Sequence, residues 1–226
     1  MTETLLSSPF LGLTLSAGAW CMGCRLQKKT GWILCNPLLV AAALIIGVLA
    51  LFRIPCQAYA LGGDFIKLML GPVTAVLALN IYNQRAILKE NFLPVLAGCL
   101  AGSLTSVGSV LLLCRLFHVE QAMTASLLPK SVTTAIAIGI AESRGGVGGI
   151  AAAAVIVTGL IGAVMAPLFA KVFRVTEPAA EGLAIGACSH ALGTTRAMEI
   201  GPVQGAMSSI AICVCGILTS VLVLFL

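Results

Sequence analysis

Long stretches of this sequence carry almost no charge, and this property limits the chain to a membrane fold. One stretch runs from Val147 to Ala170 without a charged residue, and a helix needs only about 20 residues to cross a bilayer. Of the 226 residues, 9% are charged and 59% are hydrophobic, whereas soluble domains carry about 25% charged residues. A soluble fold would lack the polar residues needed to cover its surface. We therefore predict an integral membrane protein.

The spanning elements are predicted to be helices. A lipid-facing barrel strand alternates polar and apolar residues and is flanked by aromatic girdles, but residues 38–51 and 150–160 do not alternate and only 5% of the chain is aromatic. The candidate spans are 4–24, 33–52, 64–82, 92–116, 121–141, 147–170, 182–200 and 203–226. Short loops join them, so we expect one membrane domain over residues 1–226. The predicted fold class is an all-α, multi-spanning helical bundle.

Three of these segments contain residues that interrupt a helix. Segment 64–82 contains Gly71-Pro72, segment 121–141 contains Pro129-Lys130, and segment 182–200 contains Gly193 between His190 and Arg196. Irregular backbone at membrane depth is tolerated only where it is buried in protein or lines a cavity. We therefore expect two or three discontinuous or re-entrant helices around a polar site.

The distribution of basic residues favours a segment that enters the membrane and returns. If Arg25, Lys28 and Lys29 are cytoplasmic, Arg85 and Lys89 are too, two crossings later. A full crossing by 121–141 would place Lys171 and Arg174 outside, against the positive-inside rule. A re-entrant or broken hairpin at 121–141 returns them to the cytoplasm.

The positions of the interruptions also suggest an internal repeat. A cut near residue 118 gives two halves of similar length, and 64–82 and 182–200 are each third in order within their half. Transporters built from repeats place discontinuous helices at corresponding positions that face each other near the midplane. A two-fold repeat is therefore a possible architecture, although the two halves share too little sequence identity to establish it.

The first conspicuous cluster of polar residues follows Pro129. Lys130 supplies a positive charge, and Ser131, Thr133 and Thr134 supply hydroxyl donors. Pro129 suits the first position of a half-helix, and a helix N-terminus at the bilayer centre favours an anion. These four residues predict a site for a small organic acid. The alternative is that Lys130 extends from a helix end toward the membrane surface.

The second cluster lies at the third interruption. His190 titrates near neutral pH and could carry a coupling proton, Thr194 and Thr195 add hydroxyls, and Arg196 could bind a carboxylate with two hydrogen bonds. Two alternatives remain open: a structural histidine, and a helix pair between Arg196 and Glu199 at i,i+3. Asn80, near the end of segment 64–82, completes the set of candidate binding residues.

The sequence does not support an enzyme or a cofactor site. The glycines of 145–149 lack the preceding strand and the Lys-Ser/Thr of a phosphate loop. No G-x-S-x-G motif occurs, and His118 and His190 are not at metal-ligand spacing. The basic residues are scattered at segment ends, so the formal net charge of +5 indicates topology rather than nucleic-acid binding.

Three motifs resemble those of the LrgB/CidB family of membrane proteins. They are Pro-Lys-Ser-Val-Thr-Thr at 129–134, Ser-His-Ala-Leu-Gly-Thr-Thr-Arg-Ala at 189–197 and Gly-Ala-Met-Ser-Ser at 205–209. Residues 36–39 and 71–82 fit the family as well, so the similarity covers nearly the whole chain. The sequence departs from the family pattern at Ala135 and near Asn80, where a proline is usual, and both departures bear on substrate preference.

The resemblance implies a multi-pass protein of the bacterial inner membrane, similar to the C-terminal part of the plastid glycolate/glycerate translocator. Family members are described as antiholin-like regulators of murein hydrolase export and autolysis, and others are associated with transport of carboxylates such as pyruvate. A small LrgA/CidA-type membrane protein is the partner that the resemblance implies. We also expect a homo-oligomer.

Two functions follow as hypotheses. The first is a secondary carrier of small monocarboxylates such as pyruvate or glycolate, proton-coupled, with its site at the two broken helices. The second is a holin/antiholin-like regulator of murein hydrolases. A carrier would saturate and show counterflow, whereas a pore would leak without saturation.

Overall fold

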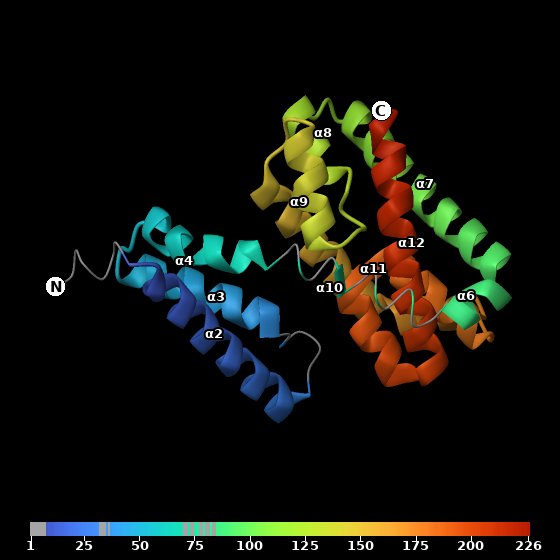
Figure 1. Ribbon diagram of the computed structural model, residues 1–226, viewed down its shortest axis with the longest axis horizontal. Coiled ribbons are helices and arrows are strands. Elements are labelled where there is room, and N and C mark those ends of the chain that lie inside the picture. Colours follow the sequence, from blue (N-terminus) through green and yellow to red (C-terminus); the bar gives the residue numbers. More distant parts are fainter. Residues whose placement is uncertain are drawn as a thin grey trace. The chain divides into compact units, whose positions relative to one another are not determined.

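The computed structural model describes residues 8–31, 35, 37–69, 72, 75–76, 79, 82 and 85–226. Within these residues every regular element is a helix (Figure 1), as the sequence predicts. The chain divides into two compact units, Met1–Thr74 and Ala75–Leu226. Asn80 and seven other residues of segment 64–82, including Gly71 at the expected break, lie outside the described residues. The site role of Asn80 and the interruption of this segment therefore remain predictions.

The described residues of the first unit form three helices, of which α2 packs against the other two. They are α2 (Pro9–Thr30), α3 (Pro37–Leu51) and α4 (Cys56–Leu68). Ser8 caps α2 by accepting a hydrogen bond from the Phe10 amide, and Pro9 occupies the first helical turn. Gly12 of α2 and Gly62 of α4 allow the two backbones to touch, because a side chain at Gly12 would overlap Tyr59 O.

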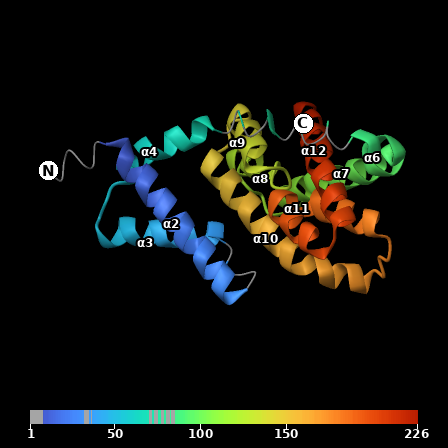
Figure 2. The same ribbon diagram turned by 60° about the horizontal axis from the view of Figure 1, so that its bottom comes forward.

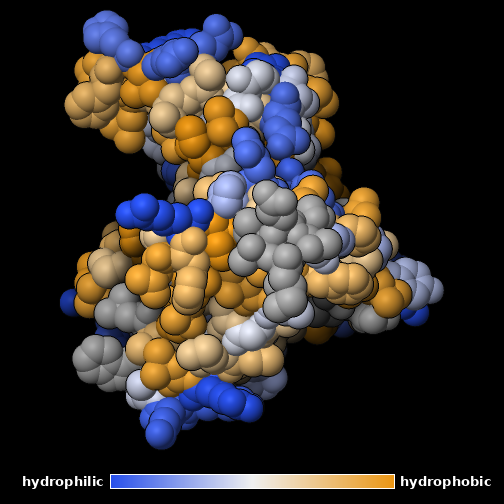
Figure 3. All heavy atoms as spheres, turned by 90° about the vertical axis from the view of Figure 1, so that its left-hand side faces the viewer, coloured by the Kyte–Doolittle hydropathy of each residue, from blue (hydrophilic) through white to orange (hydrophobic). Residues whose placement is uncertain are grey.

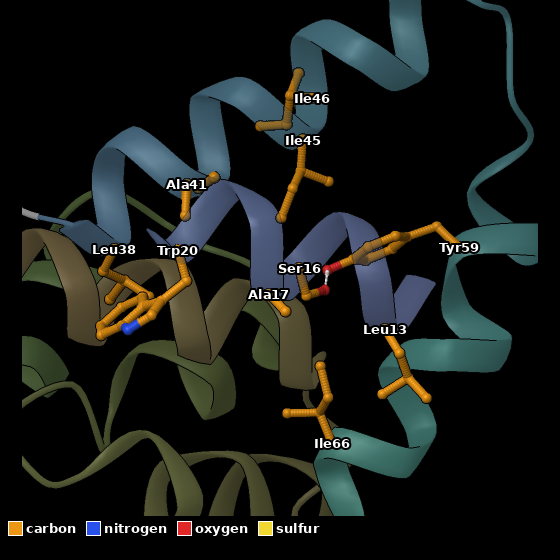
Figure 4. Close-up of a pocket in the computed structure, with 11 residues that line it drawn as sticks. Leu13, Ser16, Ala17, Trp20, Leu38, Ala41, Ile45, Ile46, Tyr59 and Ile66 are labelled. Atoms are coloured by element: carbon orange, nitrogen blue, oxygen red, sulfur yellow. Dashed lines mark hydrogen bonds between the residues drawn. The ribbon is translucent and has the colours of Figure 1, made fainter. Parts of the chain in front are cut away.

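An apolar cavity of about 730 Å³ lies among these three helices. Figure 4 shows Trp20, Leu38 and Ile45 around it, with Ser16 and Tyr59 on its wall. The Ser16 and Tyr59 hydroxyls form a hydrogen bond of 2.9 Å (Figure 4). This bond satisfies the polar groups that the cavity would otherwise leave unpaired.

The second unit contains the remaining helices. They are α6 (Arg85–Glu90), α7 (Phe92–Leu116), α8 (Gln121–Leu127), α9 (Thr134–Ser143), α10 (Gly148–Val172), α11 (Pro178–Ile200) and α12 (Pro202–Leu224). Its main core joins α7, α11 and α12 through buried small side chains, including Cys99, Ala187 and Ala211. Such side chains let helices approach closely in a membrane.

Three helices are long and apolar enough to cross a membrane within the described part of the chain: α7, α10 and α12. Large hydrophobic side chains such as Leu93, Leu112 and Phe173 are exposed on this unit, and apolar side chains cover much of the face of the molecule drawn in Figure 3. The chain is a membrane protein, as predicted. The bounds of α7 match the predicted segment 92–116.

Segment 121–141 folds into a broken hairpin. Helix α8 ends at Leu127, α9 begins at Thr134, and turns at Lys130 and Val132 join them. After α9 the chain comes back beside α8, where the Val147 amide donates a hydrogen bond of 2.7 Å to Ser126 Oγ. This hairpin, which we call hairpin 1 (residues 121–143), confirms the predicted break at Pro129-Lys130.

Helix α11 is also interrupted, and it too folds back on itself. His190 has φ 40° and ψ −137°, which no helix contains. A methyl group at Gly193 would lie 3.1 Å from Ile185 O, whereas eight residues span about 12 Å along a straight helix. Residues 191–200 therefore run back alongside residues 178–189, and we call this pair hairpin 2 (residues 178–200).

The two hairpins start from opposite ends of α10. Hairpin 1 leads into the N-terminus of α10, and hairpin 2 follows from its C-terminal end (Figure 2). Their tips meet at the N-terminal half of α10: Val132 of hairpin 1 belongs to the same buried cluster as Val155, and His190 Nε2 lies 2.9 Å from Val155 O. The predicted pairing of segments 64–82 and 182–200 involves residues that the structure does not describe. The two interrupted segments whose tips meet are 121–141 and 182–200.

Candidate functional site

A cavity of about 570 Å³ lies beside the two hairpin tips. It is lined by Ala101, Gly102, Thr105, Ser106, Ser109, Lys130, Ser131, Thr158, Ile161, Gly162, Ala187 and Cys188. These residues come from α7, the tip of hairpin 1, α10 and the first half of hairpin 2. Gly102–Ser109 lie at the middle of α7 and Thr158–Gly162 at the middle of α10, so the cavity lies midway along two of the candidate membrane spans.

Lys130 is the charged residue of this cavity. Its Nζ lies 3.5 Å from Ser106 Oγ and 3.4 Å from Ser131 Oγ, and these two hydroxyls lie 2.7 Å apart. In the part of the chain that the structure describes, the one ion pair joins Arg196 to Glu199, so Lys130 has no carboxylate partner there. An unpaired ammonium at membrane depth is costly, and an anion in the cavity would neutralise it.

The return helix of hairpin 1 begins beside this lysine. Thr133 is the N-cap of α9, but its side chain makes no capping hydrogen bond, and its Oγ1 is buried without a partner. Thr134 is partly exposed at the first position of α9. Neither threonine lines the cavity. Of the four residues predicted at this break, Lys130 and Ser131 therefore line the cavity and the two threonines do not.

His190 shapes the tip of hairpin 2 and does not line the cavity. Its side chain is 3% exposed, and Nε2 donates to Val155 O. The ring fits against α10 because residue 159 is glycine: a methyl group there would lie 2.5 Å from His190 Cε1. This geometry corresponds to the structural alternative that the sequence leaves open for His190.

The remaining predicted residues of hairpin 2 have partners outside the cavity. Thr194 Oγ1 donates to His190 O over 3.0 Å and lies 2.6 Å from Ser208 Oγ of α12. Thr195 is exposed and donates to Ala191 O. Arg196 Nη1 donates to Glu199 Oε2 over 2.6 Å, which is the alternative pairing considered for it. None of the three lines the cavity.

Sequence reasoning missed the hydroxyls on the opposite wall of the cavity. Thr105, Ser106 and Ser109 of α7 and Thr158 of α10 line it. A usable signal is present, because three hydroxyl residues fall within five positions of an otherwise apolar span. Gly98 of the same helix serves packing instead, since a methyl group there would lie 2.7 Å from Leu183 Cδ2.

The arrangement is chemically suited to a small anion. It offers one ammonium group, several hydroxyl donors and the start of α9 close behind them. No group of three or more His, Cys, Asp or Glu side chains is placed to hold a metal ion among the residues described. The described residues of the lining include no carboxylate that would attract an inorganic cation.

Comparison with known proteins identifies the family. The model of the LrgB-like family matches residues 16–226, which include both hairpins and the cavity. The chain belongs to the LrgB-like family.

Among its LrgB-like relatives is a protein named "Antiholin-like protein LrgB" of Bacillus subtilis, 40% identical over 94% of this chain and 92% of the relative. A protein of the same name in Bacillus mycoides is 37% identical over 96% and 94% of the two chains. The Bacillus subtilis protein named "Uncharacterized protein YxaC" is 34% identical over 92% and 90%. No solved structure matches this chain.

Proposed function

We propose that this LrgB-like chain is a secondary carrier of small monocarboxylates in the bacterial inner membrane. The observation that carries the proposal is the Lys130 ammonium, which faces a central cavity with two serine hydroxyls as its partners. A carboxylate that enters the cavity supplies the missing counter-charge. It also accepts the hydrogen bonds that Ser106, Ser131 and Lys130 can donate.

The opposed hairpins supply a route for alternating access. Hairpin 1 and hairpin 2 close on α10 from opposite ends, and their tips meet beside the bound acid. If the tip of one hairpin withdraws, the cavity opens toward one side of the membrane while the other tip stays closed. Alternating movement of this kind around a fixed central site is how many carriers work.

The roles predicted for His190 and Arg196 need further movement. A proton-coupling role for His190 requires a path to a ring that is buried against Val155, and binding of the acid by Arg196 requires release from Glu199. We therefore assign the acid to Lys130, Ser131 and Ser106. Proton coupling remains part of the proposal without an assigned residue.

A second candidate function is a holin/antiholin-like regulator of murein hydrolases. The names of the curated relatives favour this alternative over the carrier. A regulator of this type would act as an oligomer or with an LrgA/CidA-type partner. Under this alternative Lys130 binds no ligand, and the free-energy cost of its unpaired ammonium group is unexplained.

The decisive experiment is counterflow in liposomes that contain only this protein. Labelled pyruvate, glycolate and lactate are tested with and without a pH gradient, for the wild type and for Lys130→Gln. Lys171→Gln is the matched control, because Lys171 is exposed at the end of α10. We expect saturable exchange in the wild type and the control, and at least a tenfold weaker affinity in Lys130→Gln, since a hydrogen bond to a charged group contributes about 1.5–3 kcal/mol.

Each outcome has a distinct meaning. Exchange that Lys130→Gln leaves unchanged would disprove the assigned site. Leakage of a dye without saturation would favour the holin-like alternative. If neither exchange nor leakage occurs, the same assay with an LrgA/CidA-type protein added tests the need for a partner.

A further inference from the structure

A second cavity continues the first one along α10 and hairpin 2. Its volume is about 450 Å³, and it shares Gly162 and Cys188 with the cavity that contains Lys130. On α10 its lining continues through Ala166, Phe169 and Phe173, which follow Gly162 on the same face of the helix at successive turns. The second cavity therefore forms a groove that leads from the central site toward the C-terminal end of α10.

The lining of this groove is almost entirely apolar. Alanine, isoleucine, valine and phenylalanine side chains form its walls, and the charged residue in the lining is Glu181 at the far end. Gln204 Nε2 donates to Glu181 Oε2 over 3.2 Å. The described residues that line the groove include no cationic side chain. A carboxylate group would therefore be unfavourable inside the groove, and more unfavourable still beside Glu181.

The size of the central cavity also favours an acid with an apolar chain longer than that of pyruvate. Pockets of about 300–1,000 Å³ bind drug-sized molecules, and the central cavity alone has about 570 Å³. A three-carbon acid fills only a small part of that space. An acid that has its carboxylate at Lys130 and a longer apolar chain would occupy both the cavity and the groove.

We propose that the site prefers monocarboxylates with an apolar tail, and that the tail lies in the groove between α10 and the first half of hairpin 2. This inference rests on the proposed binding of a carboxylate at Lys130. Glu181 at the end of the groove excludes a second carboxylate on the tail. The chemical class is therefore a tailed monocarboxylate rather than a dicarboxylate.

Calorimetric titration of the full chain in lipid nanodiscs tests this preference. The ligands are pyruvate, 2-oxohexanoate and 2-oxooctanoate, which share one head group and differ only in tail length, and empty nanodiscs correct for partition into lipid. Each buried methylene can add about fourfold in affinity, which corresponds to ~0.8 kcal/mol. We expect 2-oxohexanoate to bind at least about tenfold more tightly than pyruvate.

A pair of variants locates the tail. Ala166 lines the groove and not the central cavity, so Ala166→Leu should bring the affinity ratio between 2-oxohexanoate and pyruvate close to one. Ala153→Leu is the matched control, because Ala153 is exposed on α10 and lines neither cavity. We expect the control to keep the ratio of the wild type.

The possible failures can be told apart. If no acid of any length binds, both the proposed function and this inference fail. If pyruvate binds as tightly as the longer acids, the carrier site stands and the tail inference fails, which leaves lipid chains as the occupant of the groove. If Ala166→Leu keeps the wild-type ratio, the tail does not lie in this groove.

Discussion

Lys130 and Arg196 carry the same charge, but their neighbours give them different chemistry. Arg196 has a carboxylate on its own helix, in Glu199, and its side chain is partly exposed. Among the residues that the structure describes, the hydroxyls of Ser106 and Ser131 are the hydrogen-bond partners of the Lys130 ammonium. A surface ion pair contributes little to stability, whereas an unpaired central lysine is costly unless a ligand completes it.

Ser106 positions this lysine, and its removal should weaken binding. Ser106→Ala deletes the contact with Lys130 and the 2.7 Å hydrogen bond to Ser131. We expect the affinity for a carboxylate to fall about fivefold, since one hydrogen bond contributes about 1 kcal/mol. The half-saturating concentration in counterflow measures the effect. Ser220→Ala is the control, because Ser220 bonds only within α12; an equal effect of both variants would contradict the role of Ser106.

The sequence identifies residues of the site only where they break a pattern. Pro129-Lys130 interrupts an apolar span, so Lys130 and Ser131 could be predicted. For Ser106 the cluster of hydroxyl residues at 105–109 is a weaker signal. A serine inside a helix can satisfy its hydroxyl within the same helix, so the cluster alone does not show that Ser106 faces Lys130. Arg196 follows a conspicuous break in the helical pattern, which made it a candidate. The chain folds back at His190, and Arg196 does not line the cavity. No local sequence pattern predicts that fold-back.

Both hairpins depend on close contact between their tips and α10. Hairpin 1 was predictable in outline, because the proline marks its tip and the basic residues argue against a full crossing. The break in 182–200 was predictable too, but its fold-back was not, because the turn uses a positive φ at His190, which is uncommon for a residue other than glycine. Tertiary contacts at Gly159 and Gly162 hold it in place.

Filling the space at Gly159 should therefore loosen hairpin 2. Gly159→Ala would press on the His190 ring, and overpacking costs about 1–3 kcal/mol. We expect the midpoint of thermal unfolding in detergent to fall by several degrees. Gly108→Ala of α7 meets no atom within 4 Å and should leave the midpoint unchanged or raise it, as alanine favours a helix. A midpoint raised equally in both variants would refute the described packing.

A covalent link between hairpin 1 and α7 should stop transport. The Ser106 and Ser131 hydroxyls are 2.7 Å apart, so cysteines at both positions can form a disulfide after a small adjustment. The double variant is made in a chain whose nine cysteines are replaced by serine or alanine. We expect oxidation to abolish counterflow and a reductant to restore it, while each single cysteine variant is insensitive. Normal counterflow after oxidation would show that hairpin 1 need not move.

On the scale of the whole second unit, the hairpins determine on which side each basic cluster lies. Because hairpin 1 returns to its own side, the C-terminal end of α10 lies at the same end of the unit as the N-terminus of α7 (Figure 2). Lys171 and Arg174 therefore share a side with Lys89. This arrangement matches the topology that the basic residues favour, and the positive-inside rule assigns it to the cytoplasm.

Labelling of single cysteines can test this topology. Cysteines replace Lys89, Lys171 or Glu120 in the cysteine-free chain, and a membrane-impermeant maleimide is added to vesicles of each orientation. We expect positions 89 and 171 to react in the same vesicles and position 120 to react in the opposite ones. Reaction of position 171 together with position 120 would mean that residues 121–141 cross the membrane completely.

Hairpin 2 also has a consequence for the order in which the protein is made. Its two arms rest on α12, through Ser208 against Thr194 and Gly186 and through Gln204 against Gly182, and α12 leaves the ribosome after them. Until α12 arrives, neither arm spans the bilayer and neither has its partner, and backbone without a partner is not tolerated in lipid. The central cavity can therefore be completed only late in synthesis, and a nascent chain interrupted before α12 has no working site.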